Sequence, residues 1–348
     1  MWLVDRTQSH RPDAGQAYDG HRTGLRNHAR SHAGVQPQHD MSVQGALVHL
    51  SGGPAPHRQL NRRTAPPCVA TGGTGLALSA WRLDTPCVTD DLAAKLHANV
   101  PHSARVWNYW LGGKDNFAAD RAVGDQVRAV FPEIVDAARH TRAFLRRVVT
   151  YLAAEAGIRQ FLDIGTGLPT ADNTHQVAQQ VAPDARIVYV DNDPLVLVHA
   201  RALLTSTAEG VTRYIDADLA DTGTVVREAG QNLDFSQPIA LLMFGVMGHV
   251  EDPAQARAIV QALVARLPSG SYLAMSDGTA TSDRVIESHR QYNESGAVPY
   301  HLRQVSDFTA FFDGLELIDP GVVPIPDWRP DGDPHADVDG YGGVARKA

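Results

Sequence analysis

The chain has 348 residues, with 31 Lys and Arg against 39 Asp and Glu and a formal net charge of −8. No apolar run reaches the roughly 18 residues of a membrane span. Its two cysteines, Cys68 and Cys87, are too few for a disulfide framework or a four-cysteine zinc site. The negative charge argues against a general nucleic-acid-binding protein. These numbers favour a globular cytoplasmic enzyme that associates with neither membrane nor nucleic acid.

Residues 1–90 contain no Lys, Glu, Ile or Phe, and 9 Arg minus 6 Asp give them a charge of +3, which leaves −11 for the rest. They show neither helical nor strand periodicity. Because so little apolar area could offset the ordering entropy, we expect residues 1–87 to be a disordered leader. A mis-assigned start codon would also account for it. Seven of the 16 His lie in residues 1–90 without a helical spacing, so no metal site is predicted.

Residues 88–157 are predicted to form an N-terminal helical cap. An aromatic-rich short helix precedes a double-glycine turn, a second helix covers 118–130, and an amphipathic helix follows over 133–156. Acids in the first turn after Thr89 also favour a helix over 90–98.

Residues 158–348 alternate between strand and helix patterns. Strands are predicted at 161–164, 186–190, 211–215, 238–244, 270–276, 315–319 and 341–346, with helices at 172–182, 194–206, 221–229, 253–267, 281–294 and 304–313. This alternation is typical of an α/β fold with a mostly parallel sheet and helices on both faces. Ligands of such sheets bind at the carboxyl ends of the strands.

The loop after the first strand contains Asp163, Gly165, Thr166 and Gly167. Glycines let the backbone approach a ligand closely, and a nearby helix N-terminus favours an anionic group such as a carboxylate. Thr170 occupies the third glycine position of the dinucleotide fingerprint, and Asp163 would repel a pyrophosphate. The loop therefore suits a ligand with a cationic group, although a purely structural turn is the alternative.

Acids also follow the second and third strands. Asp191 comes 24 residues after Gly167, where a carboxylate can accept both ribose hydroxyl protons. Asp218 can read the exocyclic amine of adenine, and the adjoining Asn192 and Leu219 complete the candidate site. NAD-binding proteins bind ribose with a carboxylate at the same place, so Asp191 does not distinguish the two cofactors. Asp218 could instead be a turn carboxylate that accepts hydrogen bonds from local backbone amides.

The chain closely resembles the S-adenosyl methyltransferase family of actinomycete bacteria. The resemblance rests on HSAR at 102–105, NYWLGGKDNF at 108–117, FLDIGTGLPT at 161–170, YVDNDP at 189–194 and YGGVARK at 341–347. It covers about residues 88–348. It implies a Rossmann-like doubly wound sheet of seven strands, mostly parallel with an antiparallel C-terminal strand, and S-adenosylmethionine (SAM) as the cofactor.

The resemblance also implies that the NYWLGGKDN segment belongs to the SAM site. A sulfonium is attracted to aromatic faces such as that of Tyr109, which is also a catalytic candidate. Gly113 allows a tight reversal over a ligand, and Lys114 and Arg105 could meet the cofactor carboxylate. The alternative is a helical cap that packs its aromatic side chains on the sheet.

The fourth predicted strand ends at Phe244 and Gly245, where this architecture holds the methyl donor and acceptor. His249 follows and could accept a proton from an oxygen or nitrogen nucleophile, or could simply cap its loop. Further candidates for the acceptor pocket are His289, Tyr292, Tyr300 and His301.

The sequence therefore predicts a SAM-dependent methyltransferase acting on an oxygen or nitrogen atom of a small molecule of the secondary-metabolite kind. A SAM-binding sensor without catalysis is the first alternative. An NAD(P)-dependent oxidoreductase is the second, weakened by Asp163, by Thr170 and by the lack of a Tyr-x-x-x-Lys pair after the fourth strand. The pattern does not predict an oligomeric state.

Overall fold

The computed structural model describes residues 98–170, 172–203, 205–332 and 338–348, with no account of the side chains of 200–203. The predictions for the leader at 1–87 and for the helix over 90–98 fall almost wholly outside these residues. Among the described residues, no helix is both long enough and apolar enough to cross a membrane.

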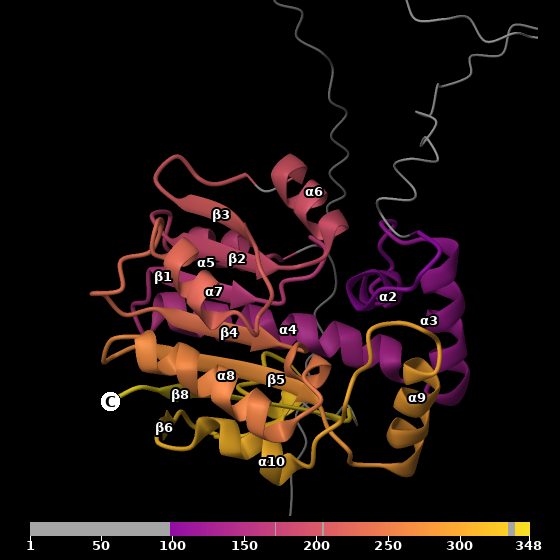
Figure 1. The fold of residues 1–348 in the computed structure, drawn as a ribbon. Coiled ribbons are helices and arrows are strands. Elements are labelled where there is room, and N and C mark those ends of the chain that lie inside the picture. The colour runs from indigo at the N-terminus through magenta and orange to yellow at the C-terminus, as the bar shows by residue number, and fades with distance from the viewer. Residues whose placement is uncertain (1–97, 171, 204, 333–337) are drawn as a thin grey trace, which may run out of the picture. The chain divides into compact units, whose positions relative to one another are not determined.

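A mixed eight-stranded sheet forms the centre of this described part of the chain (Figure 1). The strand order is β3-β2-β1-β4-β5-β8-β6, with β7 also paired to β8. The first five strands run parallel, and β8 is antiparallel to β5, β6 and β7. The strands are β1 (Gln160–Ile164), β2 (Arg186–Asp191), β3 (Val211–Asp216), β4 (Ala240–Phe244), β5 (Tyr272–Gly278), β6 (Glu316–Leu317), β7 (Val323–Pro324) and β8 (Gly340–Arg346).

The predicted fold class is confirmed, with one difference in strand number. Seven strands were expected, whereas the structure has eight because Val323 and Pro324 pair with Gly342 and Tyr341 of β8. A proline donates no ladder hydrogen bond, so a two-residue strand that contains one leaves no periodic pattern in the sequence. β6 and β7 meet different residues of β8.

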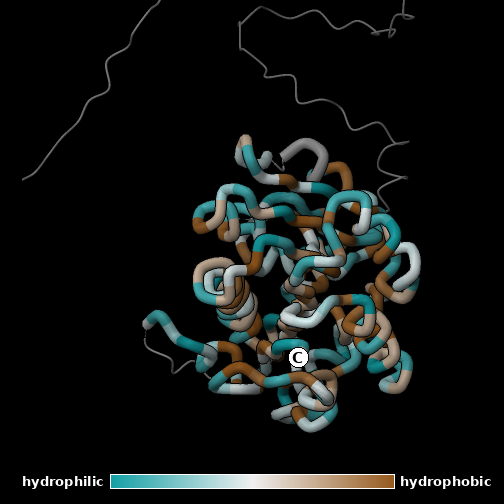
Figure 2. Tube along the Cα trace, turned by 90° about the vertical axis from the view of Figure 1, so that its left-hand side faces the viewer, coloured by the Kyte–Doolittle hydropathy of each residue, from teal (hydrophilic) through white to brown (hydrophobic). Residues whose placement is uncertain are grey.

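Helices cover both faces of the sheet. α7 and α8 contribute buried side chains to the core on one face, together with Phe308, Phe311 and Phe312, whereas α4 and α5 do so on the other. Figure 1 shows α7 and α8 in front of the sheet and α4 behind it. Hydrophobic and hydrophilic residues alternate along the outer helices (Figure 2), as expected for helices with one buried face. The helices named here are α4 (Ile134–Ala154), α5 (Thr174–Val181), α7 (Thr222–Ala229) and α8 (Pro253–Arg266).

A second, smaller core lies among α2 (Ser103–Trp110), α3 (Ala118–Val130), the start of α4 and α9 (Asp283–Asn293). In Figure 1, α2, α3 and α9 gather beyond the carboxyl ends of the parallel strands. A buried ion pair of 3.3 Å between Arg105 Nε and Asp120 Oδ1 joins α2 to α3. These helices therefore roof the edge of the sheet at which ligands of such folds bind. The remaining helices are α6 (Pro194–Leu203) and α10 (Val305–Thr309), with short 3-10 turns η1 (Met247–His249), η2 (Ala310–Phe312) and η3 (Ile325–Asp327).

Candidate active site

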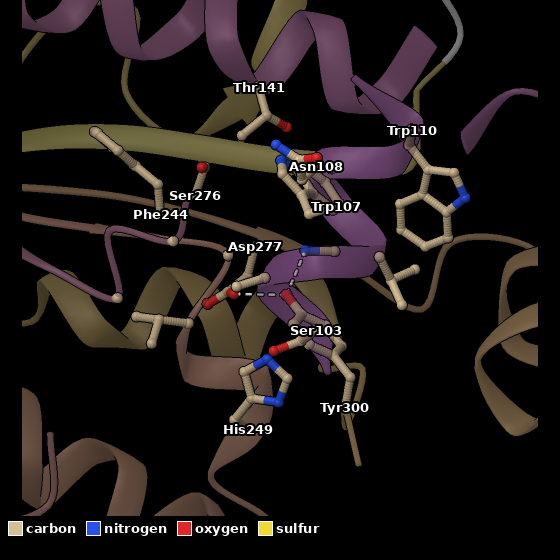
Figure 3. Close-up of a pocket in the computed structure, with 18 of the residues that line it drawn as sticks. Ser103, Trp107, Asn108, Trp110, Thr141, Phe244, His249, Ser276, Asp277 and Tyr300 are labelled. Carbon is tan, nitrogen blue, oxygen red and sulfur yellow. Dashed lines mark hydrogen bonds between the residues drawn. The ribbon is translucent and has the colours of Figure 1, made fainter. Parts of the chain in front are cut away.

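A cavity of about 490 Å³ lies between the strand ends and this helical roof. Its walls come from the loops after β1, β2, β3, β4 and β5, from α2, and from α3, α4 and α9. Figure 3 shows residues of α2 facing residues that follow β4 and β5. Ligand sites are characteristically concave, mostly apolar and supplied with a few placed polar groups.

The loop after β1 adopts a backbone that favours glycine at two positions. Gly165 and Gly167 have φ angles of 73° and 66°, in the left-handed region. At Gly165, an added Cβ would lie 2.4 Å from a methyl carbon of Val246 in the loop after β4, whereas at Gly167 the nearest atom would be 3.9 Å away. The lack of a side chain at Gly165 thus allows the loops after β1 and β4 to approach each other. Gly165 and Gly167 line the cavity together with Thr166.

The carboxylate of Asp191 connects the loops after β1 and β2. Its Oδ2 accepts the Gly167 amide at 2.8 Å, and its Oδ1 accepts the Asp193 amide at 3.0 Å. Burial raises the pKa of Asp191, and these two amides oppose that shift. The side chain is therefore held at the cavity wall by the two loops that a nucleotide would bridge.

Asp163 is buried at the end of β1, with Thr174 donating its hydroxyl to Oδ2 at 2.6 Å. Burial raises the pKa of Asp163 to about 6, and Thr174 and the nearby Arg142 guanidinium partly offset the rise. A cationic ligand group beside this carboxylate would favour its charged form.

Arg142 is a cavity residue that sequence reasoning missed. It projects from α4 and donates from Nε to Thr170 Oγ1 at 2.8 Å and from Nη2 to Asn173 Oδ1 at 3.2 Å. Its signal in the sequence is faint, because it is one of several arginines on an amphipathic helix. Only the docking of α4 beside the loop after β1 brings the guanidinium to the cavity.

The α2 segment divides into residues that line the cavity and residues that do not. His102, Ser103, Ala104, Trp107 and Asn108 line it. Arg105, Tyr109, Gly113 and Lys114, all predicted site residues, are not among the cavity-lining residues. Their contact with SAM stays a prediction.

Three of those four residues, Arg105, Tyr109 and Gly113, have a local role. Arg105 pairs with Asp120 and also donates to the Val100 carbonyl at 2.6 Å. Tyr109 donates its hydroxyl to Asp125 Oδ1 at 2.7 Å on the exposed side of α2.

Gly113 lies against the buried carboxamide of Asn108, which a Cβ there would approach to 2.3 Å. Asn108 Oδ1 accepts from the Asp115 amide and from the Asn116 side chain, at 3.1 and 3.0 Å. The polar cluster thus folds around Asn108, and Lys114 is exposed on its outside.

The acids after β3 lie near the cavity rim. Leu219 and Ala217 line the cavity, whereas Asp218 is exposed and outside the lining. Asn192 lines it too, and its Nδ2 lies 3.5 Å from Asp218 Oδ2. Asp218 also accepts the Ala220 amide at 2.8 Å, which is the local turn role considered above.

His249 lies in η1 after β4 and lines the cavity, as do Phe244 and Gly245. Its Nδ1 donates to the Pro299 carbonyl at 2.9 Å, so the neutral ring has Nε2 as its acceptor. Burial lowers the pKa of His249, which keeps the imidazole neutral near pH 7.

Tyr300 lies between two imidazoles. Its ring centroid is 5.1 Å from that of His249 and 5.4 Å from that of His289, and all three residues line the cavity. The Tyr300 hydroxyl donates to Asp277 Oδ1 at 2.7 Å and accepts the Gly278 amide at 3.2 Å (Figure 3). Burial raises the pKa of Asp277 to about 7.

Of the two other acceptor-pocket candidates, one lines the cavity and one does not. Tyr292 lines the cavity from α9, whereas His301 lies outside the lining and donates its backbone amide to the Gly248 carbonyl. Asp277, which sequence reasoning also missed, ends β5 in an apolar run without any motif. Within the described ranges, no group of three or more His, Cys, Asp and Glu side chains is arranged to hold a metal ion.

Comparison with known proteins decides the family. The family model described as S-adenosyl methyltransferase matches residues 89–348. The chain belongs to this family. The cofactor of this S-adenosyl methyltransferase is SAM, and the predicted resemblance is confirmed.

Two crystal structures are similar in both sequence and fold. A DUF574 family protein from Streptomyces avermitilis MA-4680 is 43% identical, with a TM-score of 0.70 over 73% of this chain and 100% of that one. A candidate methyltransferase from Thermobifida fusca YX is 39% identical, with a TM-score of 0.68 over 73% of this chain and 97% of that one. No curated protein matches this methyltransferase.

The cavity fits SAM on the features described above. Buried Asp163 offers a counter-charge for an ammonium, Arg142 offers one for a carboxylate, and Asp191 presents a carboxylate at the cavity wall. Gly165 and Gly167 carry no side chains, so a ligand can approach the backbone on either side of Thr166.

Proposed function

We propose that this protein transfers the methyl group of SAM to an oxygen or nitrogen atom of a small-molecule acceptor. The observation that carries the proposal is the convergence of the loops after β1, β2 and β4 on one cavity that α2, α3 and α9 roof. A roofed cavity of about 490 Å³ suits a small molecule rather than a polymer.

We assign the cofactor's groups to residues by charge and hydrogen bonding. Asp163 meets the ammonium, Arg142 the carboxylate and Asp191 the ribose hydroxyls, while Leu219 packs at the adenine and Asp218 accepts from its amine. Arg105, Tyr109 and Gly113 act by holding the α2 segment over the site, and Lys114, exposed beside them, meets the cofactor carboxylate. SAM, when bound, supplies a methyl group that is activated toward nucleophiles.

The protein contributes mainly by positioning, because in-line displacement requires the donor and the acceptor to be aligned. His249 acts as the general base. The bond from Nδ1 to Pro299 orients its ring, and Nε2 accepts the proton of the nucleophile. Gly245 and Phe244 form the floor on which the reacting atoms meet.

Calorimetry with SAM, S-adenosylhomocysteine (SAH) and NADH tests the cofactor assignment, and a methyl-transfer assay with oxygen and nitrogen acceptors tests the reaction. We expect binding of SAM and SAH, no binding of NADH, and product from at least one acceptor. Failure of both SAM and SAH to bind would contradict the proposal. SAM binding without transfer to any acceptor of a broad panel would indicate a sensor instead.

A further inference from the structure

The half of the cavity beyond β4 and β5 has predominantly apolar walls. Val127 of α3, Phe131 after it, Ile134 of α4 and Val285 of α9 are buried side chains of the second core that also line the cavity. Val298, at 45% exposure, lies on the same wall. We call this region the acceptor chamber. Its walls fit a molecule with an apolar body.

Polar groups without partners interrupt this apolar lining. Asp277 Oδ2, Ser276 Oγ and Tyr292 Oη are buried, line the cavity and make no hydrogen bond. Arg303 and the backbone amides of Met247 and Gly248 partly lower the pKa of Asp277. Buried polar atoms are nearly always paired in native proteins, so unpaired atoms on residues that line a cavity point to a ligand that pairs with them.

The three atoms specify the kind of partner. Above its pKa of about 7 the Asp277 carboxylate is ionised and only accepts, so its partner there must donate an N–H or O–H group. The two hydroxyls can donate or accept, and they therefore tolerate an ether, carbonyl, hydroxyl or amine nearby. A ligand with at least one donor group is required, and a hydrocarbon would leave Asp277 unpaired.

The charges around the cavity exclude an anion from the acceptor chamber. Four aspartates line the cavity, Asp163, Asp191, Asp277 and Asp339, whereas Arg142 is the sole Lys or Arg in the described part of its lining. Arg142 is bound to Thr170 and Asn173 beside β1, at the opposite half. Burial lowers the pKa of both His249 and His289, so neither is a cation near neutral pH. An anion here would lose its hydration without gaining a counter-charge.

We propose that the acceptor has an apolar body, a hydroxyl or amino nucleophile and no anionic group, and that a donor group of this molecule binds Asp277 Oδ2. This inference rests on the proposed function. The acceptor's nucleophilic atom forms a bond to the methyl carbon while the carbon–sulfur bond breaks and its electron pair stays on sulfur. The nucleophile's proton goes to His249 Nε2.

The test uses matched ligand pairs that differ by a carboxylate, added to the full chain loaded with SAH. The pairs are phenethylamine and phenylalanine, tyramine and tyrosine, and 4-methylphenol and 4-hydroxybenzoate. Calorimetry should show that the member without the carboxylate binds about tenfold or more tightly. Equal or tighter binding by the carboxylates, or binding by no member of any pair, overturns the proposal. SAH affinity in the same protein separates this result from failure of the proposed function.

Two variants assign the preference to residues. Asp277→Asn should reduce the tyramine-to-tyrosine affinity ratio several-fold, while Asp184→Asn, at an exposed site outside the cavity, should leave it unchanged. Val298→Lys adds a cation at an exposed position and should shift the preference toward tyrosine without disturbing the core. An Asp277→Asn protein that binds SAH and keeps the wild-type ratio contradicts the role of Asp277. An unchanged ratio in Val298→Lys contradicts the charge argument, whether or not Asp277→Asn folds.

Discussion

The backbone amide of Gly167 donates a 2.8 Å hydrogen bond to Oδ2 of Asp191, so the loop after the first strand is bonded to the acid at the end of the second. Glycine at 167 lets the loop turn with φ at 66°, and the carboxylate then holds it in that turn. The residue proposed to bind the ribose is therefore also part of the loop's structure.

Asp191→Ala should weaken SAM binding by roughly 1–3 kcal/mol, because ribose hydroxyls would lose their acceptor and two amides would lose theirs. Isothermal calorimetry measures the change. Asp191→Asn, which keeps one acceptor oxygen, should lose less. Unchanged affinity in Asp191→Ala would show that the ribose binds elsewhere.

Gly165→Ala and Gly167→Ala form a matched pair that separates backbone strain from steric overlap. Both put Ala in the left-handed region, at a cost of roughly 1–2 kcal/mol. Only Gly165→Ala also places a Cβ 2.4 Å from Val246, so its free energy of unfolding should fall further. Urea denaturation tests the order, and equal losses would mean that the loop after β4 moves aside.

His249→Ala should lower kcat by about 10²–10⁴-fold if its imidazole is the base. The matched control is His301→Ala, since His301 lies outside the cavity lining and should keep near-normal activity. If kcat of His249→Ala falls by less than threefold, His249 is not the base and the protein acts by positioning the reactants alone.

The pH profile gives a second test of His249. Because burial lowers its pKa from the ordinary 6.5, the ring is neutral and able to accept a proton at pH 7. The value of kcat/KM should therefore rise with pH, with the midpoint of the rise below about pH 6.5. His102 and His301, both near enough to lower the pKa further when charged, act in the same direction. A rise centred above pH 7 would identify a different base.

Asp277 should make stability depend on pH. Burial raises its pKa in the folded state to about 7 from the ordinary 3.8, so the folded protein holds a proton that the unfolded chain releases. The contribution of Asp277 to the free energy of unfolding is fully present below about pH 4 and is lost as pH rises to about 7. It amounts to on the order of 4 kcal/mol at most. Asp163, with a pKa of about 6, acts in the same direction.

Asp277→Asn should therefore flatten the fall in unfolding free energy between pH 4 and pH 8, measured by urea denaturation. The residual slope should come from Asp163. An identical slope in variant and wild type would mean that Asp277 is ionised throughout this range.

Tyr109→Phe removes one hydroxyl, whose bond to Asp125 lies on the exposed side of α2. We expect a change in unfolding free energy of less than about 1 kcal/mol and little change in SAM affinity. Trp107→Ala, which removes a cavity-lining ring from the same helix, should weaken SAM binding more. A large loss of affinity in Tyr109→Phe would place the phenol at the cofactor.

The sequence alone predicted the family, the acids and glycines at the strand ends, and the order of strands and helices apart from β7. α3 was predicted at its observed bounds, and β1, β2 and α8 within a residue or so, because periodicity and capping are local. Which side chains face the cavity depends on how the helices and strands pack in the folded protein. Asn108 and Tyr109 are neighbours on α2, yet the first lines the cavity and the second does not. Arg142, Asp277 and Tyr300 meet it because α4, β5 and the segment after α9 pack around one strand edge, and such contacts depend on long-range packing that a local pattern does not contain.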